Sequence, residues 1–337
     1  MISFRHDNAQ IRLEAGELWA ATSDEISYRD TSAETLRSII DEIEQGVPWK
    51  TAVTHRYAAS QPWLHQIVTS PARDLFFRQH PPVSGAKILD IGAGWGQIAL
   101  PFARTGNVEV TALEPTSERL AFIRAAAAQE HLVGRMHFVQ SDFLELNFDT
   151  FFDLICCVGV LEWVPKFHPG DPRTVQLEFL RRIRASLRPG GKCYVGIENR
   201  MGLKYLMGGR DDHTGQRHVS VFDAAIATAK HFNATGEELR VFTYSHAEYL
   251  ELFHEAGFET VETHAAFPDY KLPELILPFD NPTQFNHALL TGVLPYEHDG
   301  VDGHRLLPAE EFVSHYRSLA KMGVAHFFCP SFFFSIQ

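Results

Sequence analysis

Ile88-Leu-Asp-Ile-Gly-Ala-Gly-Trp-Gly96 places three glycines directly after an apolar run. The run contains Asp90, and Gly92, Gly94 and Gly96 follow at alternate positions. Glycine adopts positive φ without steric cost, so the backbone here can turn from a strand into a helix and lie close to a ligand. Free N–H groups at the start of such a helix favour an anionic group. The stretch predicts a nucleoside-binding turn, although dinucleotide-binding proteins, P-loops and ordinary tight turns also use glycines in this way.

Two later strand-like runs also end in an acid. Residues 108–114 end at Glu114, and residues 136–143 end with Asp142 and Phe143. In an open α/β sheet, ligands bind outside the carboxyl ends of the strands, so these groups should converge on one crevice. Glu114 is placed to accept hydrogen bonds from two ribose hydroxyls, Asp142 to accept one from an adenine amine, and Phe143 to cover the ring. Helix capping is the alternative role for both acids.

The glycine spacing argues against a phosphate-binding loop. The chain contains no Gly-x-x-x-x-Gly-Lys-Ser/Thr, and Gly96 comes two residues after Gly94, whereas the dinucleotide fingerprint has a spacing of three. A nucleoside without a phosphate chain therefore suits this turn better.

Taken in order, these motifs resemble those of the class I S-adenosylmethionine-dependent methyltransferases over residues 86–199. Residues 152–163 are similar to the fourth-strand block of that family, a helical pattern covers residues 174–187, and Leu187-Arg-Pro-Gly-Gly-Lys192 precedes a fifth strand. The resemblance implies an α/β fold: a Rossmann-like, doubly wound, seven-stranded sheet with an antiparallel last strand. It implies S-adenosylmethionine as cofactor, and the residues that it assigns to cofactor binding are Asp90, Gly92, Gly94, Gly96, Glu114, Asp142, Phe143 and Gly159.

Composition limits the class of partner. The chain has 337 residues, of which 45% are apolar and 21% charged, as in an ordinary globular protein, and its net charge is −12. Nucleic acid would be repelled, so we expect a small-molecule substrate and no nucleic-acid partner. Early charges and the lack of a long apolar run predict a cytoplasmic protein without a signal peptide or membrane segment. The sequence leaves open whether the chain forms a homodimer.

Four cysteines, Cys156, Cys157, Cys193 and Cys329, stand in apolar, strand-like surroundings. Their spacing matches neither a zinc site nor a disulfide framework. We expect them to be buried as small apolar side chains.

The organisation predicted along the chain is a cap followed by one large domain. Residues 1–85 are expected to form an N-terminal helical cap, and Pro81-Pro82-Val-Ser-Gly85 marks the boundary. Residues 86–337 are expected to form the methyltransferase domain, with insertions at about residues 201–243 and 269–322. The second insertion is predicted to be a lid of loops and short helices.

Towards the carboxyl terminus, residues 244–257 carry a serine cap and a closing glycine, which predict a helix. A strand over residues 259–266 should follow. Residues 325–336 are predicted to form a terminal strand interrupted by Pro330.

Methyl transfer from a sulfonium is an in-line displacement, so the protein mainly has to position the reactants. Positioning can contribute up to roughly 7–11 kcal/mol, whereas a general base typically adds about 10²- to 10⁴-fold in rate. The predicted base candidates are His213, which follows Asp211 and Asp212, and Glu162, for which a turn cap is the alternative. Asp211, Asp212 and His213 are an alternative metal site, but their spacing is not diagnostic and we predict no metal.

Acceptor contacts are expected near the same strand ends. The predicted substrate-binding residues are Trp163, Asn199, Arg200, Tyr205 and His218, of which His218 is also the next base candidate. The segment that contains Glu198-Asn-Arg, Gly202-Leu-Lys-Tyr205 and Asp212-His resembles a block of bacterial methyltransferases associated with glycan and natural-product biosynthesis.

The leading functional hypothesis is O-methylation of a small molecule or sugar in a biosynthetic pathway. The alternatives are an N-methyltransferase on a small molecule, an NAD-dependent oxidoreductase or epimerase, and a cofactor-binding scaffold without turnover. The Gly-x-Gly-x-Gly spacing and the Leu-Arg-Pro-Gly-Gly block disfavour the oxidoreductase.

Overall fold

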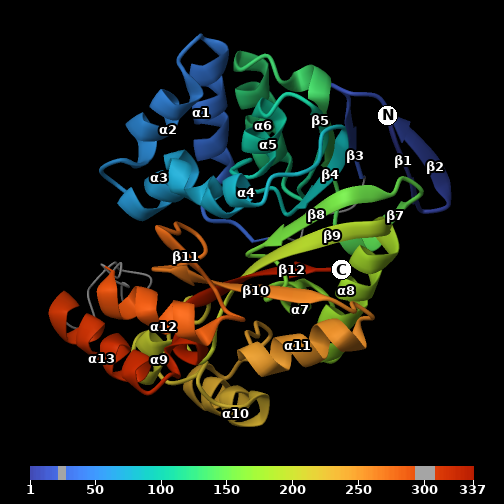
Figure 1. Cartoon of the computed structure of the whole chain (residues 1–337). Helices are drawn as coiled ribbons and strands as arrows, with labels where there is room; N and C mark the ends of the chain where they lie inside the picture. Colours follow the sequence, from blue (N-terminus) through green and yellow to red (C-terminus); the bar gives the residue numbers. More distant parts are fainter. Residues whose placement is uncertain (22–27, 293–307) are drawn as a thin grey trace. The chain divides into compact units, whose positions relative to one another are not determined.

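A computed structural model describes residues 1–21, 28–292 and 308–337 (Figure 1). The chain forms two compact units. The first contains residues 1–158 and 182–194, and the second contains residues 159–181 and 195–337. Helix α8 (Pro172–Ser186) and strand β9 (Leu187–Glu198) each contribute residues to both units.

The first unit contains a sheet with the strand order β9–β8–β4–β5–β6–β3. Its pairs β4–β5, β4–β8, β5–β6 and β3–β6 are parallel. Besides residues 187–194 of β9, the strands are β3 (Leu18–Ala20), β4 (Ala86–Ile91), β5 (Val108–Leu113), β6 (Met136–Gln140) and β8 (Phe152–Val158). Ile91 pairs with Leu113, so the glycine turn and Glu114 begin beside each other at the carboxyl ends of the strands.

An aromatic cluster joins the glycine turn to the helices of the first unit. The Trp95 ring is buried and packs edge to face on Phe122, with ring centroids 5.0 Å apart, and Trp49 packs on Phe122 at 5.9 Å. The helices are α1 (Ala33–Glu44), α2 (Trp49–Tyr57), α3 (Pro62–Thr69), α4 (Leu75–Gln79), α5 (Ala99–Arg104) and α6 (Ser117–Gln129). Short 3₁₀ turns are η1 (Pro71–Asp74), η2 (Val133–Arg135) and η3 (Phe143–Glu145).

The amino-terminal residues contain strands as well as the helices expected of the cap. Three strands occupy residues 2–20, and helices begin only at Ala33. β1 (Ile2–His6) and β2 (Ala9–Leu13) form an antiparallel hairpin, and β1 also pairs with β7 (Asn147–Phe148). Asp7 and Asn8 both have positive φ, which a tight two-residue hairpin turn requires. This turn explains why the segment folds back on itself as strands.

In the second unit the strand order is β11–β10–β12–β9. The last strand, β12, is antiparallel to β10, as predicted, and β11 is antiparallel to β10 on the other side. The strands, with residues 195–198 of β9, are β10 (Val261–Phe267), β11 (Leu275–Pro278) and β12 (Ser331–Ile336). The helices are α7 (Val164–Phe167), α9 (Leu203–Leu206), α10 (Ala224–Thr235), α11 (His246–Glu255), α12 (Pro282–Thr291), α13 (Ala309–Lys321) and the 3₁₀ turn η4 (Ala325–Phe328).

Helix α11 begins as predicted. Ser245 caps it, and Glu248 completes a capping box by accepting a hydrogen bond from the Ser245 backbone N–H at 2.8 Å. The Tyr249 and Phe253 rings of α11 pack against Phe334 of β12, with centroid distances of 5.4 and 5.0 Å. These contacts anchor the helix on the antiparallel strands.

Three details of the predicted strands are corrected. The two sheet orders contain all seven predicted strands, with β3 and β11 as additional edge strands beside β6 and β10. The terminal strand starts only after Pro330, because residues 325–328 form η4. The Leu187-Arg-Pro-Gly-Gly segment belongs to β9 and does not precede it.

Other expectations can be compared with the described residues. All four cysteines are buried and free of disulfide bonds, as predicted. In the described ranges no helix combines the length and apolar character that crossing a membrane would need. The predicted insertion at residues 201–243 contains α9 and α10. The one at residues 269–322 contains β11, α12 and α13, while its residues 293–307 lie outside the described residues.

The glycine turn yields a stability prediction. Gly96 has a φ of 76°, and a Cβ there would lie 3.1 Å from Leu100 Cδ1 and 3.2 Å from Ile123 Cγ1. Gly85 has a φ of 80° but nothing within 4 Å of such a Cβ. Gly85→Ala should lower the free energy of unfolding by about 1–2 kcal/mol, and Gly96→Ala should cost roughly 1 kcal/mol more because of crowding. Urea unfolding measures both, and equal losses would contradict the crowding.

Candidate functional site

The glycine turn has the backbone conformation that the sequence predicted. Gly92, Gly94 and Gly96 have φ values of 65°, 57° and 76°. The Gly96 N–H donates to the Ala93 carbonyl at 2.7 Å, which makes the turn tight. Helix α5 begins shortly afterwards at Ala99, so the turn joins a strand to a helix as expected.

Glu114 ties this turn to the end of β5. The Gly94 N–H donates to Glu114 Oε2 at 2.9 Å, and the Thr116 N–H donates to Oε1 at 3.1 Å. Arg119 Nη1 lies 3.9 Å from Oε1, and Arg119 is itself paired with Asp30 at 2.6 Å. Burial raises the pKa of Glu114 above its ordinary value, although Arg119 and the two N–H groups favour the charged form. Each carboxylate oxygen of Glu114 retains a further lone pair that can accept a hydrogen bond from a ribose hydroxyl. Binding of ribose hydroxyls by Glu114 stays a prediction.

Asp90 is buried at the end of β4 beside the turn. Its Oδ2 has no hydrogen-bond partner among the residues that the structure describes. Burial raises the pKa of Asp90 to about 7, against smaller opposing effects of the Ala99 N–H and of Arg73. An orphaned, buried oxygen in this position is consistent with a group that a ligand would satisfy.

Asp142 and Phe143 follow β6 as predicted, and their contacts in the folded chain are structural. Asp142 Oδ1 accepts the Leu144 N–H at 2.7 Å and thereby caps η3. The Phe143 ring is buried and stacks on Phe148, with centroids 6.4 Å apart. Capping was the alternative role for Asp142, and contact of either residue with an adenine stays a prediction.

The second unit contains a buried cluster of charged side chains around His213. Its Nε2 lies 3.8 Å from Glu162 Oε1 and 3.6 Å from Glu198 Oε2. Its Nδ1 lies 3.7 Å from Asp211 Oδ2. The side chains of His213, Glu162 and Glu198 are at most 5% exposed. The fold thus brings the two predicted base candidates together and adds Glu198.

Sequence reasoning missed Glu198 and two lysines of this cluster. Lys271 Nζ donates to Glu198 Oε1, and Lys204 Nζ donates to Asp212 Oδ2 at 2.7 Å. Tyr205, a predicted substrate contact, donates its hydroxyl to the same oxygen of Asp212 at 2.7 Å. Glu198 could have been found by the criterion that selected the acid after β5, because it too stands at the end of a strand. No local signal distinguishes Lys271.

The carboxylates set the proton affinity of His213. Burial alone lowers the pKa of this imidazole, but Glu198, Asp211 and Glu162 outweigh burial and hold the pKa well above its ordinary value. Burial raises the pKa of Glu162, whereas Lys271 and His213 overcome burial and lower the pKa of Glu198. These side chains therefore favour the protonated form of His213.

Two other predicted substrate residues contact side chains of the second unit. Trp163 packs its ring edge to face on His213, with centroids 5.1 Å apart. Arg200 forms a two-pronged ion pair with Glu248, at 2.7 and 3.0 Å. Trp163 therefore belongs to the cluster, whereas the Arg200 guanidinium is paired with α11.

Asn199 is buried and bonded to the backbone. Its amide Nδ2 donates to the Phe327 and Cys329 carbonyls at 3.0 and 2.7 Å. This amide thus holds the segment before β12 to the end of β9, and a contact of Asn199 with an acceptor stays a prediction.

Two further predicted residues have backbone roles. His218 is exposed, with a φ of 57°, and packs near Gly208. Gly159 has a φ of 71°, and a Cβ there would lie 2.8 Å from the Tyr270 hydroxyl. Gly159 therefore leaves room for Tyr270, and cofactor contact by Gly159 stays a prediction.

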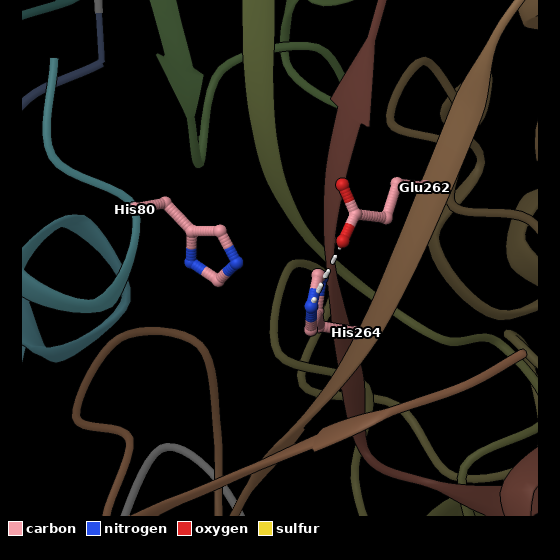
Figure 2. A group of neighbouring side chains, drawn as sticks. All are labelled: His80, Glu262 and His264. Carbon is pink, nitrogen blue, oxygen red and sulfur yellow. Dashed lines mark ion pairs between the residues drawn. The ribbon is translucent and has the colours of Figure 1, made fainter. Parts of the chain in front are cut away.

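A separate carboxylate–imidazole pair lies on β10. Glu262 Oε1 and His264 Nε2 come from alternate positions of this strand and are 3.5 Å apart (Figure 2). The Glu262 side chain is 50% exposed, so water screens the pair and its contribution to stability is small.

The region around the glycine turn is similar to known proteins. Residues 88–191 match a family model described as a methyltransferase domain. The chain is 28% identical over 153 residues to a ubiquinone biosynthesis O-methyltransferase of Rickettsia conorii, covering 45% of this chain and 48% of that protein. It is 31% identical over 145 residues to the enzyme of the same name from Aeromonas salmonicida, covering 43% and 56%. The chain thus spans about half the length of these curated relatives.

Among solved structures, Phospholethanolamine N-methyltransferase 2 of Haemonchus contortus is 14% identical, with a TM-score of 0.45, covering 90% of this chain and 60% of that one. The matched family model covers the glycine turn, the acid after β5 and the acid after β6. The match to the family model therefore favours a methyltransferase over an NAD-dependent oxidoreductase as the interpretation of the glycine turn.

Asp90 yields a prediction for stability against pH. Its pKa is about 7 in the folded chain, against an ordinary value of 3.8, so the folded state binds the proton more tightly than the unfolded state. Its contribution to the free energy of unfolding should fall as the pH rises from about 4 to above 7, by roughly 4 kcal/mol at most. Urea unfolding at several pH values should show that Asp90→Asn removes this contribution to the slope.

The matched control is Asp149→Asn, which changes a partly exposed carboxylate of the same unit. This variant should keep the slope of the unchanged protein. If Asp90→Asn and Asp149→Asn have the same slope, burial of the Asp90 charge does not govern stability.

Proposed function

We propose that this chain is an S-adenosylmethionine-dependent methyltransferase that methylates an oxygen of a small-molecule or sugar acceptor in a biosynthetic pathway. The observation that carries the proposal is the hydrogen bond from the Gly94 N–H to Glu114, within the residues that match a methyltransferase domain. The bond joins the glycine turn to a strand-end carboxylate. The names of the curated relatives favour oxygen as the methylated atom.

The residues of the first unit suit a nucleoside cofactor with a charged amino-acid tail. The three glycines of the turn carry no Cβ, so the backbone of the turn can lie close to a ligand. Asp90 offers a buried oxygen without a partner among the described residues, and Glu114 offers lone pairs for ribose hydroxyls. We propose the same cofactor-binding set as the sequence predicts, with Asp142 and Phe143 at the adenine and Gly159 as a further contact.

The cofactor, when bound, supplies an activated methyl group on a sulfonium, which leaves as a neutral thioether. The chain then has to orient the acceptor oxygen and take its proton. We propose that the His213–Glu162 pair, 3.8 Å apart in the second unit, receives that proton, with Trp163 and Tyr205 beside the acceptor. His213 accepts a proton only in its neutral form, which the surrounding carboxylates disfavour because they raise its pKa.

The acceptor class is the open part of this proposal. The segment from Glu198 to His213 favours the glycan or natural-product acceptors of the bacterial methyltransferases that it resembles, whereas the relatives are named for ubiquinone biosynthesis. Both classes present hydroxyl groups on rings. A panel of phenol and sugar hydroxyl acceptors, assayed with a methyl-labelled donor, distinguishes them, and methylation confined to amines would replace oxygen with nitrogen in the proposal.

Cofactor binding tests the first unit. Glu114→Ala removes a charged hydrogen-bond acceptor, so the affinity for S-adenosylhomocysteine should fall roughly ten- to hundredfold in calorimetry. Glu34→Ala is the control, because this carboxylate is exposed in the first turn of α1 in the same unit. An affinity unchanged by Glu114→Ala, with the fold intact by circular dichroism, would remove the crevice assignment.

Turnover tests the second unit. His213→Ala should lower kcat about 10²- to 10⁴-fold on an accepted hydroxyl substrate while leaving S-adenosylhomocysteine affinity unchanged. His254→Ala, at an exposed histidine of α11, should leave both quantities unchanged. A near-normal kcat in the His213→Ala enzyme would reduce His213 to a structural residue.

A further inference from the structure

The charged cluster of the second unit presents three side chains that suit a metal ion. Glu162, Glu198 and His213 each offer one ligand atom, and these atoms all lie within 4.8 Å of one another. They come from three separate places: the segment after β8, the end of β9 and the loop before α10. Tertiary folding, and no local motif, brings them together.

Two buried oxygens of this cluster lack hydrogen-bond partners in the part of the chain that the structure describes. Within the described ranges, neither Glu162 Oε2 nor Glu198 Oε2 has a hydrogen-bond partner, although both carboxylates are almost completely buried. Leaving a buried polar group unsatisfied costs about 1–3 kcal/mol, and more for a charged one. Glu198 Oε2 is also the oxygen that lies 3.6 Å from His213 Nε2, so it points at the centre of the cluster.

The ion pairs of the cluster hold more negative than positive groups. They join five carboxylates to three cationic side chains: Glu162, Glu198, Asp211, Asp212 and Asp269 on one side, Lys204, Lys271 and His213 on the other. Buried carboxylates need compensating charge, since an uncompensated buried charge is strongly destabilising. A divalent cation between these carboxylates would add positive charge where the ion pairs leave an excess of negative groups.

The distances leave space for an ion. His213 Nε2 lies 3.8 Å from Glu162 Oε1 and 3.6 Å from Glu198 Oε2. Zinc and similar ions bind nitrogen and oxygen ligands at about 2.0–2.2 Å, which exceeds half of either separation, so one ion can contact both members of each pair. Small side-chain movements would complete the coordination.

Each of the three ligands already has an outer partner. Asp211 Oδ2 lies 3.7 Å from the Nδ1 of His213, which leaves Nε2 directed at the other two ligands. Lys271 holds the second oxygen of Glu198, and the Tyr270 hydroxyl lies 3.5 Å from Glu162 Oε1. Carboxylates and other groups behind the ligands orient metal sites in this way.

We propose that Glu162, Glu198 and His213 bind a divalent transition-metal ion. An imidazole with two carboxylates suits Mn²⁺ or Zn²⁺ better than Mg²⁺, which prefers oxygen ligands alone. Three protein ligands leave open positions, as in catalytic metal sites.

The site differs from the alternative metal site that the sequence suggested, Asp211 with Asp212 and His213. Both aspartates are bonded to other groups of the chain, and neither belongs to the group of ligand atoms that lie within 4.8 Å of one another. The donors are Thr214 and Ser220 for Asp211, and Lys204 and Tyr205 for Asp212.

This inference stands apart from methyl transfer, since the ion would bind whether or not the chain transfers a methyl group. Within the proposed function, a bound ion would lower the pKa of an acceptor hydroxyl, and water would take the released proton in place of the His213–Glu162 pair. Failure of one proposal is therefore distinguishable from failure of the other: S-adenosylhomocysteine binding in chelator tests the cofactor site, and metal binding without cofactor tests this cluster.

The experiment titrates the chelator-stripped full chain with Mn²⁺, following free Mn²⁺ by electron paramagnetic resonance, and with Zn²⁺ by calorimetry. We expect one ion per chain with a dissociation constant below about 1 mM, and weaker binding of Mg²⁺. Glu198→Gln and His213→Gln should each weaken binding at least about tenfold. Glu262→Gln, which removes a carboxylate of β10, should bind like the unchanged protein.

Thermal unfolding shows whether each variant is folded before titration. The ion should raise the melting temperature of the unchanged protein and of Glu262→Gln, and should not raise that of Glu198→Gln. If the unchanged protein binds neither Mn²⁺ nor Zn²⁺, or if both ligand variants bind them as tightly as the unchanged protein, the site is excluded. A variant that does not fold is replaced by Glu162→Gln, judged by the same criteria.

Discussion

A hydrogen bond from the Gly94 N–H to the Glu114 carboxylate holds the candidate cofactor site together. A buried carboxylate must be satisfied, and the turn after β4 supplies the donor because its three glycines all take positive φ. Trp95 lies between these glycines and packs on Phe122 of α6, so the turn is held from its other side as well. Two parallel strands, one turn and one helix are thereby locked into a single arrangement.

Glu114 of the first unit and the pair Glu162 and Glu198 of the second unit are satisfied by different partners, and this difference separates their chemistry. In the first unit, backbone N–H groups and Arg119 satisfy Glu114. In the second unit, Glu162 and Glu198 face an imidazole and a lysine, and one oxygen of each has no hydrogen-bond partner among the described residues. The first arrangement suits a neutral, hydroxyl-bearing ligand, whereas the second favours a cation or a proton.

Much of the fold could be predicted because its signals are local. The apolar runs that form β4, β5, β6 and β8 lie between turn residues, and the Ser245 cap with Glu248 marks the start of α11. The hairpin of β1 and β2 was missed because strands this short carry little periodic signal. The 3₁₀ turn before Pro330 was missed because its apolar residues look like those of the strand that follows.

Neighbouring residues in the chain were enough to predict the glycine turn, the strand-end acids and the base candidates, because each is a local pattern. Folding alone placed His213 between Glu162 and Glu198. Folding also paired Lys271 with Glu198 and bonded the Asn199 amide to backbone carbonyls. Burial and charge depend on residues far apart in sequence, so a pKa or a ligand set is a property of the assembled interior, and no short stretch of the chain contains it.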